Sequence, residues 1–212
     1  MKFHPSPELL LRYSAGTLTP AMSFVVASHV QQCNICQSTQ DNLEYMGGVS
    51  IENYADSTVN DASFDSLLNR LEDNPTSDQS NLNIPLATDY QSMFSDIVDK
   101  KYENVGWQSI AGKIDRAEVN VADGDNQVEI LRFAPNAKIP QHTHKGNEYT
   151  VILEGSYTDE LGEFGVGDFI HMNQNHHHRP VASKKGCVCI AVTDAPMHFT
   201  GVLGPVLNLF AR

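Results

Sequence analysis

Two histidines and a glutamate stand at the start of an apolar stretch in the second half of the chain. From Gln141 to Gly155 the sequence reads QHTHKGNEYTVILEG, with His142 and His144 one residue apart and Glu148 four positions later. Side chains two residues apart on extended backbone share a face, and Glu148 falls on that face if the extended phase continues. Two imidazoles and a carboxylate on one face suit zinc, iron, nickel or manganese. The stretch therefore predicts a metal site on a β-strand.

The composition indicates an ordinary folded protein with room for two domains. The chain has 212 residues and a net charge of −12, which argues against direct binding to nucleic acid or to an anionic membrane. Residues 1–88 carry ten acidic and three basic side chains, so this half favours a basic protein partner or serves solubility. The sequence shows no signal peptide and no apolar run of transmembrane length. We therefore expect a cytoplasmic protein without a direct nucleic-acid or membrane partner.

A second group of metal-binding residue types lies near the start of the chain. His29, Cys33 and Cys36 form H-x3-C-x2-C in a segment that predicts one helix from about Ala21 to Met46, ended by two glycines. Spacings of i,i+4 and i,i+3 place the three side chains on one helix face. Three such donors nearly complete a tetrahedral zinc site.

His4 is the natural fourth donor, because no other histidine precedes residue 142 except His29. It stands just before a short predicted helix, for which Ser6 is a suitable N-cap and Pro7 a suitable first residue. The alternative interpretation is that Cys33 and Cys36 are buried apolar thiols and His29 a surface residue.

The region between these two groups predicts helices and a linker. Phe64, Leu67, Leu68 and Leu71 follow the i, i+3, i+4, i+7 pattern of an amphipathic helix. Its apolar face needs a cover, either from its own domain or from a partner. Residues 74–83 are polar and rich in Pro, Ser and Asn, which is typical of a linker, and another short helix is expected over residues 89–98.

From Trp107 onward the hydrophobic pattern changes to period two. Strands are expected at 114–121, 128–133, 147–154, 169–172 and 187–192, separated by turn-forming segments. Many short strands with closely spaced turns favour a jelly-roll barrel. Cys187 and Cys189 alternate onto one face of the last strand, where they are core thiols by default and redox-sensing thiols by the alternative interpretation.

The spacing H-x-H, x3, E, x6, G resembles the first metal-binding motif of the cupin superfamily. On that resemblance His142, His144 and Glu148 are metal ligands, and a later histidine completes the set. The second motif departs from the family pattern, because Gly165-Val166-Gly167-Asp168 replaces Pro-x-Gly-Asp and Ile170 stands where a histidine is usual. The fourth ligand must therefore come from His171, His176, His177 or His178.

The N-terminal H…H-x3-C-x2-C pattern, followed by a cupin, resembles the ChrR family of anti-sigma factors over nearly the full chain. The resemblance implies a two-domain α + β protein. Its parts would be a small zinc-binding helical anti-sigma domain at residues 1–85, a linker and helix at 86–105, and a cupin-like jelly-roll β-barrel at 106–212.

The family pattern also selects a fourth barrel ligand. It places a histidine about thirty residues after the glutamate and before x-Pro, which His178-Arg179-Pro180 matches. His176 would share the face of His178 on an extended segment and is its rival, whereas His177 would face away.

The resemblance implies a function. Zinc held by His4, His29, Cys33 and Cys36 would support a domain that sequesters an extracytoplasmic-function sigma factor. The barrel, with zinc or another divalent transition metal, would sense an oxidant or small molecule, such as singlet oxygen or an organic hydroperoxide, and trigger release.

The alternative is a cupin metalloenzyme of the dioxygenase or isomerase type with a regulatory zinc domain. A third possibility is a storage or sugar-sensing cupin. Neither explains the H-x3-C-x2-C segment, for which an enzyme has no obvious need. The sequence therefore predicts a non-enzymatic regulator, and we assign no catalytic residue.

Overall fold

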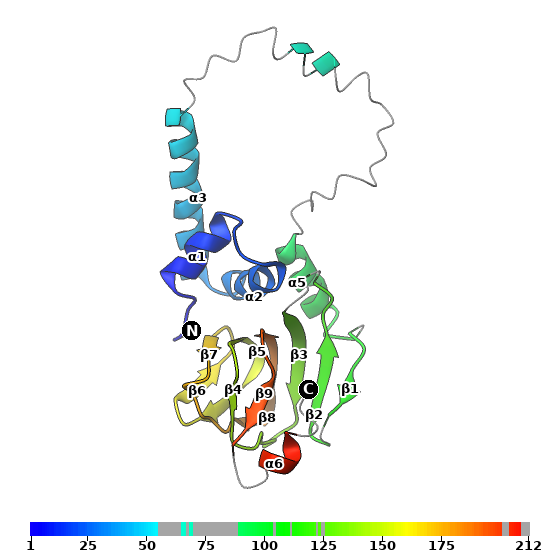
Figure 1. The fold of residues 1–212 in the computed structure, drawn as a ribbon. Coiled ribbons are helices and arrows are strands. Elements are labelled where there is room, and N and C mark those ends of the chain that lie inside the picture. Colours follow the sequence, from blue (N-terminus) through cyan, green and yellow to red (C-terminus); the bar gives the residue numbers. More distant parts are fainter. Residues whose placement is uncertain are drawn as a thin grey trace.

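The computed structural model describes residues 1–54, 65–66, 68–69, 89–103, 105–110, 112–121, 123, 126–200 and 204–208. Helices come first and strands follow, which confirms the predicted α + β class (Figure 1). The elements are α1 Pro7–Ser14, α2 Pro20–Val30, α3 Asn34–Tyr54, α5 Tyr90–Asp99, β1 Gln108–Ser109, β2 Ile114–Glu118, β3 Gln127–Phe133, β4 His142–His144, β5 Glu148–Asp159, β6 Gly162–Gly165, β7 Phe169–Met172, β8 Val181–Thr193, β9 Met197–Phe199 and α6 Gly204–Leu207.

The first helix begins as its sequence predicts. The Ser6 side chain accepts a hydrogen bond from the backbone N–H of Leu9, and Pro7 is the first residue of α1. Helix α2 is capped in the same way, because the Thr19 hydroxyl accepts a hydrogen bond from the backbone N–H of Met22. In both cases a hydroxyl satisfies an N–H that has no partner within the helix.

The prediction of one continuous helix from Ala21 to Met46 is wrong. The chain turns at residues 31–33, where the N–H of Cys33 donates to the carbonyl of Val30, and α3 then starts at Asn34. No glycine or proline marks this break. The two glycines at 47–48 do not end α3, because glycine inside a helix costs only about 1 kcal/mol.

The strands form a seven-stranded antiparallel sheet and a separate two-stranded one. The main order is β1-β2-β3-β8-β5-β6, with β7 also paired to β5, while β4 pairs with β9. The long strands β5 and β8 pair with each other in the middle of the main sheet. Both exceed their predictions: β5 continues to Asp159 and β8 begins at Val181. The short strands β1, β6 and β9 carry too little pattern to be predicted.

Strand β8 is buried on both of its faces. Val188, Ile190 and Val192 belong to the core beneath the helices, whereas Cys187 and Cys189 belong to the core inside the barrel. This double burial explains why residues 187–192 read as a continuous apolar run.

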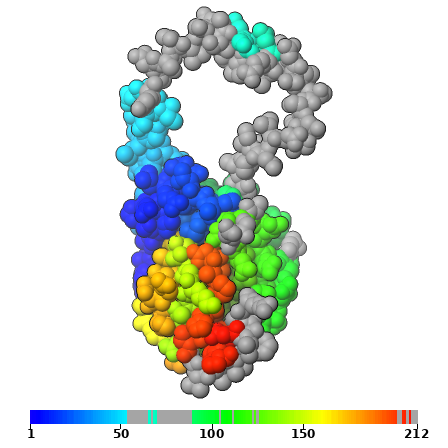
Figure 2. Space-filling view, in the orientation of Figure 1, coloured from blue at the N-terminus to red at the C-terminus, as the bar shows by residue number. Residues whose placement is uncertain are grey.

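Helix α2 is the element that joins the helical region to the barrel. It is apolar around its whole circumference, and Phe24, Val25 and Val26 have no exposed surface. It lies on β5 and β8 and contacts α1, α3 and α5 on its other sides. Figures 1 and 2 show the N-terminal helices seated directly on one end of the barrel. A helix of this composition is stable only when it is covered on all sides.

Several predictions fall outside the described residues. These are the polar linker at 74–83 and most of the amphipathic helix built on Phe64, Leu67 and Leu71; its Leu68 is described and is exposed. The domain boundaries at 85 and 105 stay a prediction. None of the helices in the described ranges combines the length and apolarity needed to cross a membrane.

Replacing Gly155 by alanine should destabilise the barrel. Gly155 has a φ of 69°, and a Cβ there would overlap the carbonyl oxygen of Gly186. We expect a loss of about 2–4 kcal/mol in the free energy of unfolding, measured in urea. Gly112→Ala is the matched control, because Gly112 has a φ of 60° and open space around it. It should lose only about 1–2 kcal/mol, and equal losses would contradict the proposed overlap.

Candidate metal centres

Four elements contribute to a cluster between the helices and the barrel. His4 precedes α1, His29 lies in the last turn of α2, Cys33 lies in the turn that follows, and Cys36 stands in the first turn of α3. The His4 Nδ1 atom is 3.4 Å from each of the two sulfurs and 3.4 Å from His29 Nε2. The distance from His29 Nε2 to Cys36 Sγ is 3.3 Å. The break at residue 31 thus brings together donors that the sequence places on one continuous helix.

The donor set and its spacing fit zinc. Bonds of about 2.3 Å to sulfur and about 2.0–2.1 Å to nitrogen in a tetrahedron place donor atoms about 3.3–3.8 Å apart. The measured separations of 3.3–3.4 Å lie within that range. Two thiols with two imidazoles are also a common structural zinc set.

Burial keeps His29 of this cluster neutral and keeps Cys36 uncharged unless a cation binds. Burial lowers the pKa of His29 to about 4, so its ring is neutral at pH 7. Its Nδ1–H donates to the carbonyl of Gly167 over 2.7 Å, which leaves Nε2 with a free lone pair facing the sulfurs. Burial and the neighbouring Cys33 raise the pKa of Cys36 to about 12. A cysteine in such a place ionises only when a cation balances its charge.

A second cluster lies inside the barrel. His142 and His144 come from β4, Glu148 begins β5, and His178 precedes β8. The His144 Nε2 atom lies 2.8 Å from Glu148 Oε2 and 3.2 Å from His178 Nε2. The donor atoms of the four residues all lie within 4.8 Å of one another. Within the described residues, these two clusters are the groups of His, Cys, Asp and Glu close enough to hold a metal ion.

Backbone pairing determines which histidine joins this cluster. The N–H of His142 donates to the carbonyl of His178 over 3.1 Å, and the N–H of His178 donates back over 3.0 Å. The structure therefore brings in His178 rather than His176, whose Nδ1 accepts from the N–H of Asn173. His171 faces outward and stacks on Tyr149.

Two barrel histidines each donate a ring N–H to a residue outside the cluster. One of these acceptors, Asp159, was not predicted from the sequence. Asp159 Oδ2 accepts from His178 Nδ1 over 3.0 Å, and the carbonyl of Pro140 accepts from His142 Nδ1 over 3.0 Å. Asp159 is eleven positions from Glu148, an odd separation that predicts the opposite face of a regular strand. Register shifts in β5 between Ile152 and Tyr157 reverse that alternation.

Burial prepares the barrel donors for a metal. It lowers the pKa of His142 to about 4. Burial would raise the pKa of Glu148, but the hydrogen bond from His144 and the neighbouring imidazoles outweigh it and lower the value to about 2. A carboxylate beside imidazole nitrogens suits a divalent transition metal, and this donor set does not single one out.

The remaining cysteines lie inside the barrel as free thiols. Cys187 and Cys189 are buried within the inner core. A hydrogen bond with Cys187, together with burial, raises the pKa of Cys189 well above its ordinary value. A buried neutral thiol packs as a small apolar group, so this environment favours the core interpretation over a redox one.

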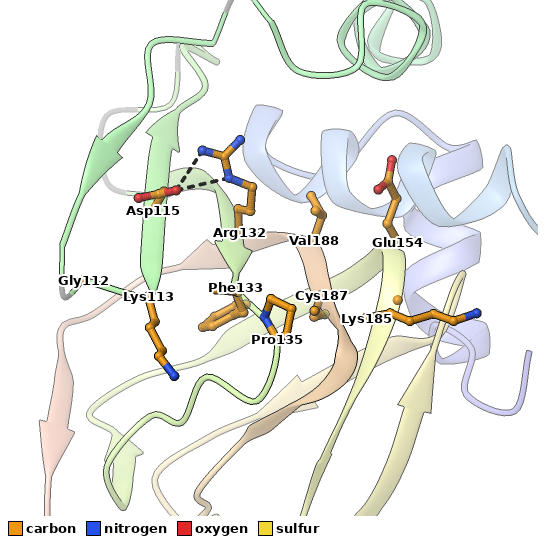
Figure 3. Close-up of a pocket in the computed structure, with 13 residues that line it drawn as sticks. Gly112, Lys113, Asp115, Arg132, Phe133, Pro135, Glu154, Lys185, Cys187 and Val188 are labelled. Carbon is orange, nitrogen blue, oxygen red and sulfur yellow. Dashed lines mark hydrogen bonds and ion pairs between the residues drawn. The ribbon is translucent and has the colours of Figure 1, made fainter.

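A pocket of about 540 Å³ lies outside both clusters (Figure 3). Its lining includes Arg132, which is bound to Asp115 at 2.7 Å and stacks over Trp107. Lys113 and Lys185 extend from it in different directions. None of the cluster donors in the described part of the chain lines this pocket, and its charges do not converge on one point.

Comparison with known proteins gives concordant results. A model of the ChrR cupin-like domain matches residues 98–197. The anti-sigma-E factor ChrR of Cereibacter sphaeroides is 31% identical to this chain, over 100% of this chain and 99% of that protein. A chain in the crystal structure of Rhodobacter sphaeroides SigE in complex with the anti-sigma ChrR aligns with a TM-score of 0.71 and 31% identity. That alignment covers 91% of this chain and 99% of the other.

Removing one donor from each cluster should remove about one metal equivalent each time. We expect Cys33→Ser to lose the metal of the helical cluster and His142→Ala to lose that of the barrel, because the clusters share no donor. Elemental analysis of purified protein measures both. Cys187→Ser, a control thiol in the inner core, should retain both metals. Loss of both metals through one substitution would contradict two independent sites.

Asp159→Asn should weaken the barrel site without removing a ligand. Loss of the carboxylate that orients a metal-bound histidine typically costs 10–100-fold in metal affinity, so about that loss is expected here. Competition with a chromophoric chelator measures the affinity. Asp115→Asn, which breaks only a surface ion pair, is the control and should leave the affinity unchanged. An unchanged affinity in Asp159→Asn would show that the contact with His178 does not tune the site.

Proposed function

The chain belongs to the ChrR family of anti-sigma factors, and we propose that its N-terminal helices hold an extracytoplasmic-function sigma factor in an inactive complex. Similarity to an anti-sigma factor across the whole length indicates a regulatory protein rather than an enzyme. The alternative of a dioxygenase- or isomerase-type enzyme has no comparable support. Sigma factors act on RNA polymerase in the cytoplasm, so the proposal assigns the protein to that compartment.

The observation that carries the proposal is an apolar face on α3 that its own chain leaves exposed. Ile35, Tyr45, Met46 and Val49 are all exposed, three of them by 63–73%. At 100° per residue these four side chains fall within a sector roughly 100° wide, which they share with Ser38, Asn42 and Asn53. Ile51 is also exposed, by 72%, on another side of the helix. Leu43, on another side of the helix, packs against the shared core. A helix face of this width normally lies against a partner.

The position and charge of α3 fit a protein partner. The C-terminal half of the helix extends away from the rest of the described chain (Figure 1). Asp41 and Glu52 are exposed at one margin of the apolar face. An apolar strip bordered by carboxylates suits a partner with an apolar groove and basic residues beside it.

Zinc in the helical cluster would fix the direction of α3. The donors come from the segment before α1, from α2, from the turn and from α3. Bound zinc supplies folding free energy by tying such elements together. His4 and His29 would thus hold the start of α3 against the barrel, and Cys33 and Cys36 would hold the turn that sets its angle.

The barrel is the proposed sensor, and its signal is proposed to be oxidative. It packs against α2 through the shared core, so a rearrangement of β5 or β8 would reach the helices. Two routes lead to release: a change at the barrel donors, or oxidation of the thiolates of Cys33 and Cys36. Both thiols are at most 4% exposed, so the second route first requires the cluster to open.

Co-expression with the sigma factor encoded beside the gene tests the function. We expect the two proteins to copurify in equal amounts and the complex to block transcription by core polymerase supplied with that sigma factor. Failure to bind any sigma factor encoded in the vicinity would sink the proposal.

A charge on the exposed face of α3 should disrupt the complex. For Met46→Glu we expect at least about a tenfold loss of affinity, because a carboxylate would be buried at the interface without a partner. Leu161→Glu is the control, since Leu161 is 55% exposed on the barrel. Calorimetric titration measures both variants. Equal binding by Met46→Glu and the unsubstituted protein would show that α3 does not form the interface.

A further inference from the structure

The turn between β6 and β7, residues 165–168, lies against the first residues of the chain. Figure 1 shows the N-terminus beside these two strands. The N–H of Phe169 donates to the carbonyl of Phe3 over 3.0 Å, and the Phe3 ring packs on Phe164 with centroids 5.0 Å apart. The segment that carries His4 is therefore bound to the barrel before α1 begins.

Asp168 makes the central contacts of this arrangement. Its Oδ1 accepts from the backbone N–H of Lys2 over 2.6 Å and from that of Phe3 over 3.3 Å. Its Oδ2 accepts from the N–H of Gly165 over 2.8 Å, and the side chain is 4% exposed. One buried carboxylate thus spans its own turn and the N-terminal segment.

The same turn reaches a second donor of the helical cluster. The residue before Asp168 is Gly167, whose carbonyl accepts from His29 Nδ1 over 2.7 Å. Gly167 has a φ of 82°, a conformation that glycine adopts without strain. Two adjacent residues of the barrel therefore act on both histidines of the cluster, one through its backbone carbonyl and the other through the segment ending in His4.

The turn is also fixed to a strand of the barrel cluster. The N–H of Gly167 donates to the carbonyl of Ile152 over 2.8 Å, and the N–H of Ile152 donates to the carbonyl of Asp168 over 3.3 Å. Ile152 lies on β5, which begins with Glu148. The position of the turn therefore depends on the strand that supplies a donor to the other cluster.

We propose that Asp168 is a positioning residue of the helical metal site, so that the barrel sets how tightly that site holds its metal. Without the carboxylate, the segment ahead of α1 loses two hydrogen bonds and His4 loses its fixed place beside the sulfurs. The other three donors stay in position. This inference rests on the metal site of the proposed function, but not on binding of a sigma factor.

Turn formation alone does not account for these contacts. To close the turn, the Asp168 carboxylate has only to accept a hydrogen bond from the N–H of Gly165. Oδ2 alone does this. Oδ1 faces the N-terminal segment and accepts from two of its N–H groups. An asparagine at this position can accept either from the N-terminal segment or from Gly165, but not from both. Its amide nitrogen donates hydrogen bonds and does not accept them.

The test compares Asp168→Asn with the unsubstituted protein in full-length form. Zinc affinity is measured by competition with a chromophoric chelator, and the helical site is then loaded with cobalt. We expect about a tenfold loss of zinc affinity, the lower end of the range for partners that orient ligands. In the cobalt spectrum the thiolate charge-transfer bands should persist. The d–d bands should change as a solvent ligand replaces His4.

Asp123→Asn is the matched control. Asp123 is also a barrel carboxylate bonded to a backbone N–H of the helical region, that of Ala21 at 3.0 Å. It also accepts from the Asn126 amide, and neither of these partners is a donor of the cluster. Its zinc affinity and cobalt spectrum should match those of the unsubstituted protein. If both variants lose affinity equally, the effect is general docking of the helices and the positioning role is wrong.

Phe3→Ala covers the case in which Asp168→Asn does not fold. The substitution removes the ring contact with Phe164 at a side chain that is 39% exposed, and leaves the turn intact. It should lower zinc affinity severalfold with the same change in the cobalt d–d bands. Unchanged affinity and spectra in the folded variants would overturn the proposal, as would the absence of zinc from the unsubstituted protein. Loss of sigma binding with unchanged zinc affinity would instead count only against the proposed function.

Discussion

Burial of α2 is the constraint on which the rest of this structure depends. The helix presents apolar side chains in every direction, so it needs the barrel on one side and the other helices elsewhere. Burying each large apolar side chain contributes about 1.5–3 kcal/mol. Phe24, Val25 and Val26 therefore favour docking of the helices on β5 and β8 over an arrangement of two separate bodies. The candidate metal cluster that includes His29, in the last turn of α2, is consequently placed beside the barrel.

The two clusters differ in how the fold brings their donors together. In the barrel, β4 supplies two donors and a backbone bridge from His142 to His178 adds another. Sheet hydrogen bonding thus forms this site almost completely. In the helical region each donor comes from a different element, so the site relies on the docking of α2 and on the N-terminal segment. We therefore expect the geometry of the helical cluster to depend more on packing between elements than that of the barrel cluster does.

Local patterns predicted much of this arrangement. The start of α1 at Pro7 and the α + β class follow from capping residues and hydrophobic periodicity. So do the start of α2 within one residue of the predicted Ala21, the helix near residues 90–99 and the centres of the main strands. The break at residues 31–33 did not, because no glycine or proline marks it and docking on the barrel decides it. Asp159 was missed for a similar reason. A bulge in β5 changes the face of every later residue, and Gly155 is the one sequence signal near it, which by itself does not fix where the alternation reverses.

The sequence by itself determined most of the candidate donors, because histidine, cysteine and glutamate at these strand and helix spacings are typical of metal ligands. It also determined the family, through motifs at both ends of the chain. The family pattern also selected His178, which pairs with His142 at the barrel site. Only the tertiary structure decided that Asp159 orients His178, and that Gly167 and Asp168 contact the helical cluster and its N-terminal segment. These contacts join residues from 19 to 166 positions apart. Periodicity and spacing report the faces of a single element, whereas contacts between elements depend on how those elements pack.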